Sequence, residues 1–119
     1  MDLKNMTNDK KLELTEDPNT PSDVLRDLAK NEFWLKRPIA LNNNTPEDVL
    51  LGFTQDQNWV VRRNVAMNPK SSITVIVMLF GREKNLKKPN IVVIRALYNN
   101  HKLPYVAKVI LETLFGEWL

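Results

Sequence analysis

Three stretches of the chain carry one pattern: NTPSDVLRDLAKN at residues 19–31, NNTPEDVLLGFTQD at 43–56 and NPKSSITVIVMLF at 68–80. The second copy matches the first at a shift of 25 residues, and the third matches the second at a shift of 26. The apolar positions of each copy follow the spacing i, i+1, i+4, which is typical of one face of a helix and differs from the alternation of a strand. The sequence therefore predicts an all-α fold.

Each copy is followed by a second apolar segment. FWLKRPIALN at residues 33–42 matches WVVRRNVAMN at 59–68, and both have apolar residues four apart on one helical face. Pro38 lies inside the first of these segments, where a regular helix interior would lose about 3 kcal/mol. The second helices are therefore expected to be short, to start near Arg37, or to be partly 3₁₀.

The first helices have a recognisable start in two copies. Thr20-Pro21 and Thr45-Pro46 are both followed by acidic residues. We expect the threonine to cap the first free amides and the proline to occupy the first helical position. The acid would then lie in the positively polarised first turn.

We expect one helical-repeat domain over residues 1–119, in which each unit of about 25 residues is a long helix followed by a shorter one. The predicted parts are a partial N-terminal cap (1–16), clear repeats at about 17–42 and 43–68, and degraded repeats at about 69–100 and 101–119. No unit can bury its own apolar face, so stacked neighbours must form the core. Leu50 and Val65 are expected to lie between repeats.

The strings DPNTPSDVLRDLAKN (17–31), ALNNNTPEDVLLGF (40–53) and VVRRNVAMNP (60–69) resemble the leucine-rich repeat variant family. The resemblance covers residues 11–80 best and implies a short right-handed superhelical solenoid, a HEAT-like array that alternates α- and 3₁₀-helices. Some members carry a cysteine-rich iron–sulfur segment, which this cysteine-free sequence cannot supply. The string FWLKR (33–37) is also similar to turns of HEAT-like alkylpurine DNA glycosylases.

The composition excludes several kinds of catalytic and metal site. With no cysteine and a single histidine, the chain has no disulfide, iron–sulfur cluster, thiol nucleophile or histidine-based metal site. The carboxylate pairs Glu16-Asp17 and Glu47-Asp48 are interpreted as partners of helix dipoles, and His101 as a surface turn residue. We therefore expect a non-enzymatic protein without a cofactor. No apolar run approaches the ~18 residues of a membrane span, and the first residues lack the apolar core of a signal peptide, which predicts a cytoplasmic protein.

Charge is distributed unevenly. Residues 1–60 hold 7 basic and 11 acidic side chains (−4), whereas residues 61–119 hold 10 basic and 3 acidic ones (+7). Such asymmetry indicates an anionic partner at one end. The insertion GREKNLKKPN at 81–90 contributes four cations that are either a solvated loop or ligand contacts: Arg82, Lys84, Lys87 and Lys88.

The second segments carry equivalent cations, Lys36 with Arg62 and Arg37 with Arg63. In one of two registers Arg95 is a third member of the Arg37 series. In a stacked array such residues form a row that could follow an anionic ligand. We interpret Arg37 and Arg63 as structural, bound to helix carbonyls or to carboxylates such as Asp56. Lys36 and Arg62 remain candidates for ligand contacts.

The aromatic residues of the second segments are likewise interpreted either as structural residues or as candidate ligand contacts. Phe33 and Trp59 are equivalent and are expected in the core between repeats. Trp34 is expected to be partly exposed beside Lys36 and Arg37, where it would suit a nucleic-acid base or a peptide side chain.

The candidate ligand-binding residues are thus Trp34, Lys36, Arg62, Arg82, Lys84, Lys87 and Lys88. The first functional hypothesis is a module that binds another protein. The alternative is a nucleic-acid-binding protein that uses the basic C-terminal half, and an enzyme is third. The sequence leaves the oligomeric state open.

Overall fold

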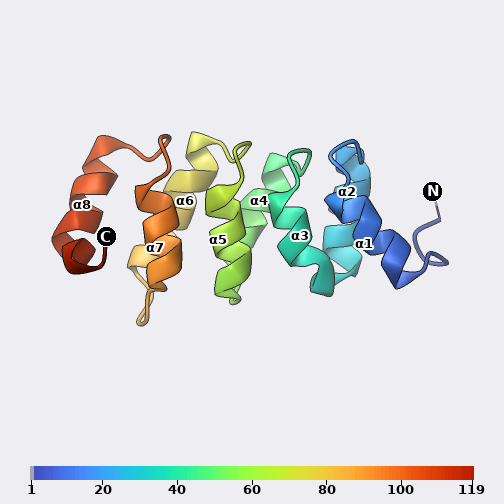
Figure 1. Ribbon diagram of the computed structural model, residues 1–119, viewed down its shortest axis with the longest axis horizontal. Coiled ribbons are helices and arrows are strands. Elements are labelled where there is room, and N and C mark those ends of the chain that lie inside the picture. The colour runs from blue at the N-terminus through green and yellow to red at the C-terminus, as the bar shows by residue number, and fades with distance from the viewer. Residues whose placement is uncertain (1) are drawn as a thin grey trace.

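The computed structural model describes residues 2–119, and within this range it contains only helices and the loops that join them (Figure 1). The elements are α1 (Asn8–Glu16), α2 (Ser22–Asn31), the 3₁₀-helix η1 (Phe33–Leu35), α3 (Lys36–Leu41), α4 (Glu47–Phe53), α5 (Trp59–Met67), α6 (Ile73–Lys84), α7 (Ile91–Tyr98), α8 (Tyr105–Phe115) and the 3₁₀-helix η2 (Gly116–Trp118). The predicted all-α class is confirmed.

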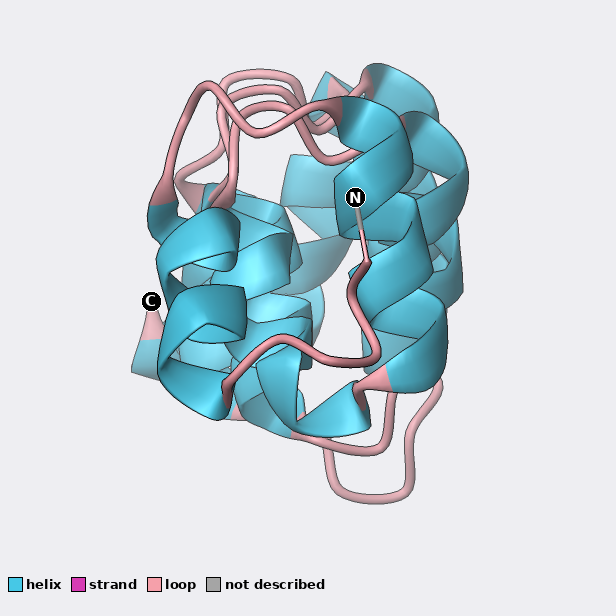
Figure 2. Cartoon of the chain, turned by 90° about the vertical axis from the view of Figure 1, so that its right-hand side faces the viewer, coloured by secondary structure: helices cyan, strands magenta, loops and turns pink. Residues whose placement is uncertain are grey.

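The helices lie in two layers along an elongated body of 50 × 23 × 18 Å. Helices α1, α3, α5 and α7 form a front row toward the viewer of Figure 1, and α2, α4 and α6 form a back row behind it. The view along the array in Figure 2 shows the two layers side by side. Within the front row α3 packs on both α1 and α5, and α5 packs on α7. Each front helix is thus flanked by the equivalent helix of the next segment.

The helix starts differ from the prediction in two respects, and the first is that each proline is the N-cap residue instead of the first helical residue. Pro21 and Pro46 stand just before α2 and α4 in an extended conformation, and neither helix has a side-chain cap. The threonine hydroxyls instead donate backward, Thr20 to the carbonyl of Leu14 at 2.6 Å and Thr45 to the carbonyl of Ile39 at 2.5 Å. The predicted threonine caps are wrong, because these hydroxyls donate to carbonyls at the end of the preceding helix.

The second segments are short, as predicted. The first of them begins as the 3₁₀-helix η1 and continues as the six-residue α3, which places Pro38 in the first turn, where its missing N–H removes no helical hydrogen bond. The expected order of a long helix before a shorter one fails in the middle repeat. There α4 has 7 residues and α5 has 9.

The core runs through the whole array. Leu50 and Val65, the two residues expected between repeats, are both fully buried. The same cluster takes in Leu25 and Ile39 toward one end and Leu97 and Leu111 toward the other. Full burial of a leucine or valine side chain contributes about 1.5–3 kcal/mol, so the continuous cluster is the main source of stability.

Asparagine side chains connect the loops at the upper edge of Figure 1. Asn42 Nδ2 donates to the carbonyls of Thr15 and Asp17, at 2.7 and 2.9 Å, and Asn68 Nδ2 donates to the carbonyls of Ala40 and Asn42, at 2.9 and 3.0 Å. Asn100 continues the series with a bond to the carbonyl of Ala66. Each loop is therefore hydrogen-bonded to the one before it.

These residues also settle the register of the last segment. Asn68 and Asn100 form equivalent bridges just after α5 and α7, and Asn58 and Asn90 cap the starts of these helices, so both pairs give a shift of 32 residues. The spacing between these equivalent residues is therefore six longer than the usual 26, so the segment at 81–90 contains an insertion of six residues, whereas the sequence alone suggests about five. In this register Arg95 is equivalent to Arg63.

Candidate binding surface

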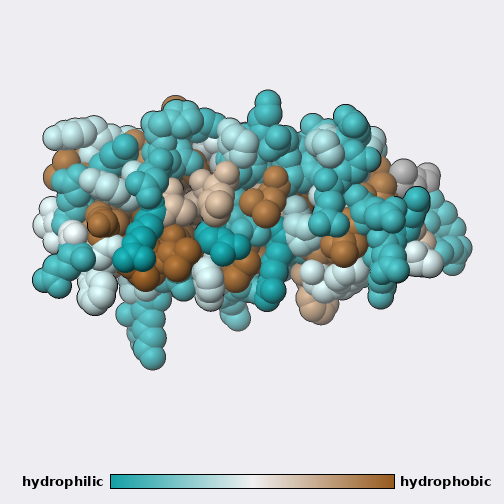
Figure 3. Space-filling view, in the orientation of Figure 1, coloured by the Kyte–Doolittle hydropathy of each residue, from teal (hydrophilic) through white to brown (hydrophobic). Residues whose placement is uncertain are grey.

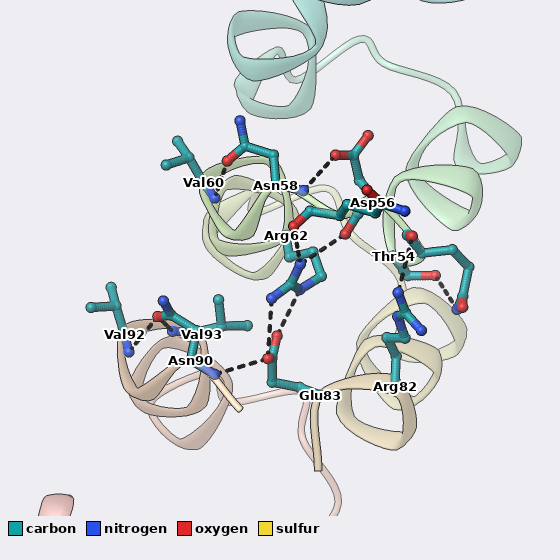
Figure 4. Close-up of polar contacts among 12 residues, drawn as sticks. Thr54, Asp56, Asn58, Val60, Arg62, Arg82, Glu83, Asn90, Val92 and Val93 are labelled. Atoms are coloured by element: carbon teal, nitrogen blue, oxygen red, sulfur yellow. Dashed lines mark hydrogen bonds and ion pairs between the residues drawn. The ribbon is translucent and has the colours of Figure 1, made fainter. Parts of the chain in front are cut away.

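Arg62 lies inside the protein. Its side chain is 5% exposed and pairs with Glu83, which is 0% exposed, through Nε to Oε1 at 2.8 Å and Nη2 to Oε2 at 3.3 Å (Figure 4). Its Nη1 donates to the carbonyls of Asp56 and Gln57. The prediction that Arg62 meets a ligand is therefore wrong.

The Arg62–Glu83 pair organises the lower edge of the array. Glu83 Oε2 also accepts a hydrogen bond from the backbone N–H of Asn90 at 3.0 Å. Asn90 in turn caps α7 by accepting from the N–H groups of Val92 and Val93 (Figure 4). One buried ion pair thus connects α5, α6 and the first turn of α7.

Lys36 also forms an ion pair within the protein. Its Nζ lies 3.0 Å from Oδ2 of Asp56, in the loop before α5, and the aspartate side chain is largely buried. An equivalent contact joins Lys11 of α1 to Glu32 at the end of α2. The first cation of each second segment therefore contacts the next unit, and Lys36, whose side chain is 34% exposed, stays a candidate ligand contact.

The second cations lie on the outside. Arg37 and Arg95 are exposed and Arg63 is half-buried, and among residues 2–119 none of the three pairs with a carboxylate. Since Arg37, Arg63 and Arg95 are equivalent residues of the adjacent helices α3, α5 and α7, we call them the arginine row. The interpretation of Arg37 and Arg63 as partners of neighbouring carboxylates is wrong.

The central arginine of the row is held in place. Arg63 lies over the ring of Trp59, with its guanidinium carbon 5.5 Å from the ring centroid. Its Nε and Nη2 donate to Oδ1 of Asn64 at 3.2 and 3.0 Å. Asn64 is buried, and its Nδ2 donates to the backbone carbonyl of Arg37 at 3.0 Å. Asn64 therefore connects two members of the arginine row.

Apolar side chains flank the arginine row. One turn before the arginines stand Phe33, which is 78% exposed, and Trp59, which is 38% exposed. One turn after them stand Leu41 and Met67, 47% and 59% exposed. The core positions predicted for Phe33 and Trp59 are wrong. Figure 3 shows hydrophobic patches between polar side chains over the front row. We call the arginine row with these four residues the front face.

A hollow between η1 and α5 adjoins the front face. Phe33, Trp34 and Arg37 line it, together with Lys36, Asp56, Asn58 and Val61. Trp34 is partly exposed beside Lys36 and Arg37, as predicted, and its Nε1 donates to Oε2 of Glu32 at 3.0 Å. Hydrogen bonds from Lys11 and then from Trp34 hold the pKa of the Glu32 carboxyl below its usual value.

The basic insertion forms a second, separate surface. The loop at 85–90 projects from the lower edge of Figure 1, and Lys87 and Lys88 are exposed on it. Together with Arg82 they line an open depression whose other lining residues are Gln57, Arg62 and Leu86. Lys84 lies apart from that depression, over the ring of Phe80 at 5.8 Å. Only three of the four candidate cations therefore share one surface.

Part of the Arg82 side chain contacts the protein itself. Its Nη2 donates to the carbonyl of Gln55 at 3.4 Å, and its buried Nε has no hydrogen-bond partner among residues 2–119. The exposed cations of the depression are therefore Lys87 and Lys88.

The described part of the chain holds no cluster of metal-binding side chains. Residues 2–119 contain no group of three or more histidine, cysteine, aspartate or glutamate side chains that could hold a metal ion. His101 is exposed in the turn before α8, where the sequence predicts it. Over the same residues, no helix combines the length and apolar character that crossing a membrane requires.

Comparison with protein-family models, with curated proteins and with solved structures finds no match to this chain. The resemblance to the leucine-rich repeat variant family therefore stays a hypothesis.

Three features of this region are not predicted from the sequence: the exposure of Phe33 and Trp59, the bridging role of Asn64, and Glu83 as the partner of Arg62. The exposure of Phe33 and Trp59 is indicated by a pattern in the sequence. Phe33-Arg37-Leu41 and Trp59-Arg63-Met67 are the same triplet at a shift of 26, with residues four apart and hence on one side of a helix.

Proposed function

We propose that the protein is a short right-handed superhelical solenoid of the leucine-rich repeat variant kind, and that it is a non-enzymatic module that binds another protein on the front face. The observation that carries this proposal is the arginine row. The three equivalent arginines on adjacent helices have no carboxylate partner within residues 2–119. Arg37 and Arg63 lie between exposed apolar side chains, and Arg95 donates its Nε to the backbone carbonyl of Trp118 at 2.6 Å.

The two-row packing and the equivalent asparagine bridges support a repeat architecture. In such an array each unit contacts only its neighbours, and equivalent positions form continuous surfaces suited to extended ligands. The handedness and the family membership belong to the proposal.

The composition of the front face supports a protein partner. Tryptophan and arginine are enriched among residues that dominate protein–protein binding, and methionine and phenylalanine are enriched in interfaces. The stacking of Arg63 on Trp59 and its bonds to Asn64 reduce the entropy that this side chain loses on binding.

A second candidate function is nucleic-acid binding at the depression below α5. It is favoured by the exposed Lys87 and Lys88 beside Arg82, and by the excess of cations over residues 61–119. Binding of this kind would depend steeply on salt, with a slope of about 0.7–0.9 per phosphate contact in a plot of log affinity against log salt.

The experiment is a pull-down with nuclease treatment before and after capture, using three forms of the protein. They are the wild type, the front variant R37Q/R63Q/R95Q and the loop variant R82Q/K87Q/K88Q. The proposal predicts that wild type and loop variant retain a nuclease-resistant protein partner and that the front variant loses it. Circular dichroism checks that all three are helical.

Loss of the partner from the loop variant alone, or release of the partner by nuclease, would contradict the proposal. A mobility shift of generic DNA or RNA at about 50 mM salt that only the loop variant abolishes would establish the second candidate function in its place.

A further inference from the structure

We propose that the front face recognises an extended segment of its partner in which acidic residues recur at every third position, each carboxylate meeting one arginine of the arginine row. This inference deepens the proposed function and rests on it. It names the chemistry of the bound segment.

Charge complementarity gives the first argument. Helices α3, α5 and α7, which carry Arg37, Arg63 and Arg95, contain no acidic residue. The cationic surface ends at α1, where Leu12 occupies the equivalent position and Glu13 and Glu16 lie on the same helix. The row therefore matches an anionic segment that spans three helices.

The spacing of the arginines gives the second argument. Packed neighbouring helices lie about 8–10 Å apart, which sets the separation of equivalent side chains in the row. An extended polyproline II chain has three residues per turn and rises about 3.1 Å per residue, so side chains at i and i+3 lie on one side about 9 Å apart. Carboxylates three residues apart therefore match successive arginines.

The geometry of Arg63 gives the third argument. Its Nε and one hydrogen of Nη2 are used by Asn64. This leaves Nη1 and the second hydrogen of Nη2, the pair that binds a carboxylate through two parallel hydrogen bonds. Because Trp59 and Asn64 fix the guanidinium, this donor pair is oriented before the ligand arrives.

The apolar flanks favour a peptide over a polynucleotide. Leu41 and Met67 on one side of the row, and Phe33 and Trp59 on the other, offer aliphatic and aromatic contacts to the residues between the carboxylates. A long polyanion that continued along the front row would meet Glu13 and Glu16 of α1, whereas a short segment can end on the exposed Leu12.

The test uses fluorescein-labelled synthetic peptides and fluorescence polarisation with the full chain. The probe has three Glu-Leu-Pro triplets in succession. A block peptide has the same composition with the three glutamates contiguous, and a neutral peptide has glutamine in place of glutamate. The proteins are wild type, the front variant R37Q/R63Q/R95Q and a matched control, K4Q/K30Q/K70Q, which loses three exposed cations elsewhere.

The inference predicts that wild type and matched control bind the triplet peptide equally. The front variant should bind it about tenfold or more weakly, a change of about 1.4 kcal/mol or more. The neutral peptide and the block peptide should also bind wild type more weakly than the triplet peptide.

Equal binding of the block and triplet peptides, equal binding by the front variant, or no binding at about 1 mM protein would each overturn the inference. Tighter binding of a ten-nucleotide oligothymidylate through the same arginines would overturn it in favour of nucleic acid. If the front variant still loses its protein partner in the pull-down, only the spacing argument fails, and the proposed function stands.

Discussion

The Arg62–Glu83 pair shows how one buried charge depends on another. Removing either partner leaves a charge in the interior without compensation, whereas replacing both by apolar residues is often neutral. The protein contains its own example of that replacement. At the shift of 32 residues, Ile94 and Phe115 occupy the equivalent positions, and both pack in or against the apolar core. Apolar side chains therefore stand where the equivalent segment has the ion pair.

Glu83→Ala is expected to lower the free energy of unfolding by about 3–5 kcal/mol, because Arg62 loses its buried partner. The double variant R62M/E83L should lie close to the wild type. Urea unfolding followed by circular dichroism measures both. The control is Arg26→Ala in the exposed Arg26–Asp48 pair, where about 0–1 kcal/mol is expected. A double variant as unstable as Glu83→Ala would contradict this account.

Glu32 makes the folding stability depend on pH, and the direction follows from its lowered pKa. Because its pKa is lower in the folded protein than its ordinary value, its contribution to stability is complete above the unfolded pKa of about 4.5 and is lost as the pH falls through the folded pKa. Wild-type stability should therefore decrease from pH 6 to pH 3, and Glu32→Gln should flatten the lower part of that curve. Parallel curves for the two proteins in urea unfolding would refute this.

The two neighbouring arginines show what could be predicted at this scale. Arg62 lies three residues before the buried Val65 and therefore near it on the helix surface, whereas Arg63 lies two residues from both Val61 and Val65 and faces outward. The apolar spacing alone therefore indicates that Arg62 faces the interior and that Arg63 faces outward. The partner of Arg62 could not be predicted, because Glu83 comes from a different helix.

At the level of elements, the loops of the upper edge are held by asparagine amides. The Oδ1 atom of Asn68 accepts from the N–H of Lys70, while its Nδ2 satisfies two carbonyls of the preceding loop region. Such short polar side chains turn the chain at a helix end and at the same time connect neighbouring units. They are the polar counterpart of the apolar core between the helices.

Asn68→Ala should cost about 2–4 kcal/mol, because three hydrogen bonds are lost at about 0.5–1.5 kcal/mol each and buried carbonyls are left unsatisfied. Thermal or urea unfolding measures the change. Asn43, in the preceding loop, is exposed, and Asn43→Ala is the matched control with an expected change within about 0.5 kcal/mol. Equal effects of the two substitutions would show that the asparagine bridges do not stabilise the array.

The sequence predicted the existence and order of the elements well, since apolar periodicity determines which residues are buried. It also predicted the short second helices, from Pro38. It did not predict what Thr20 and Thr45 bond to, because a threonine before a helix can satisfy either the following amides or the preceding carbonyls, and only packing decides between them.

At the scale of the whole molecule, the front and lower surfaces are basic for different reasons. The front face owes its charge to three helices without acidic residues, and the lower edge owes its charge to the inserted loop. The sequence revealed the charge asymmetry between the halves but assigned it to the loop and to Arg62. It could not show that the exposed arginines form one surface, since that depends on how α3, α5 and α7 pack.

The central claim is that the front face is the binding surface, and NMR mapping tests it most directly. A titration of isotope-labelled protein with the triplet peptide should shift the indole N–H of Trp59, the Nε–H of Arg63 and amides of α3, α5 and α7. Signals of the loop at 85–90 and of the back row α2, α4 and α6 should stay unchanged. Shifts confined to that loop or to the back row would contradict the account.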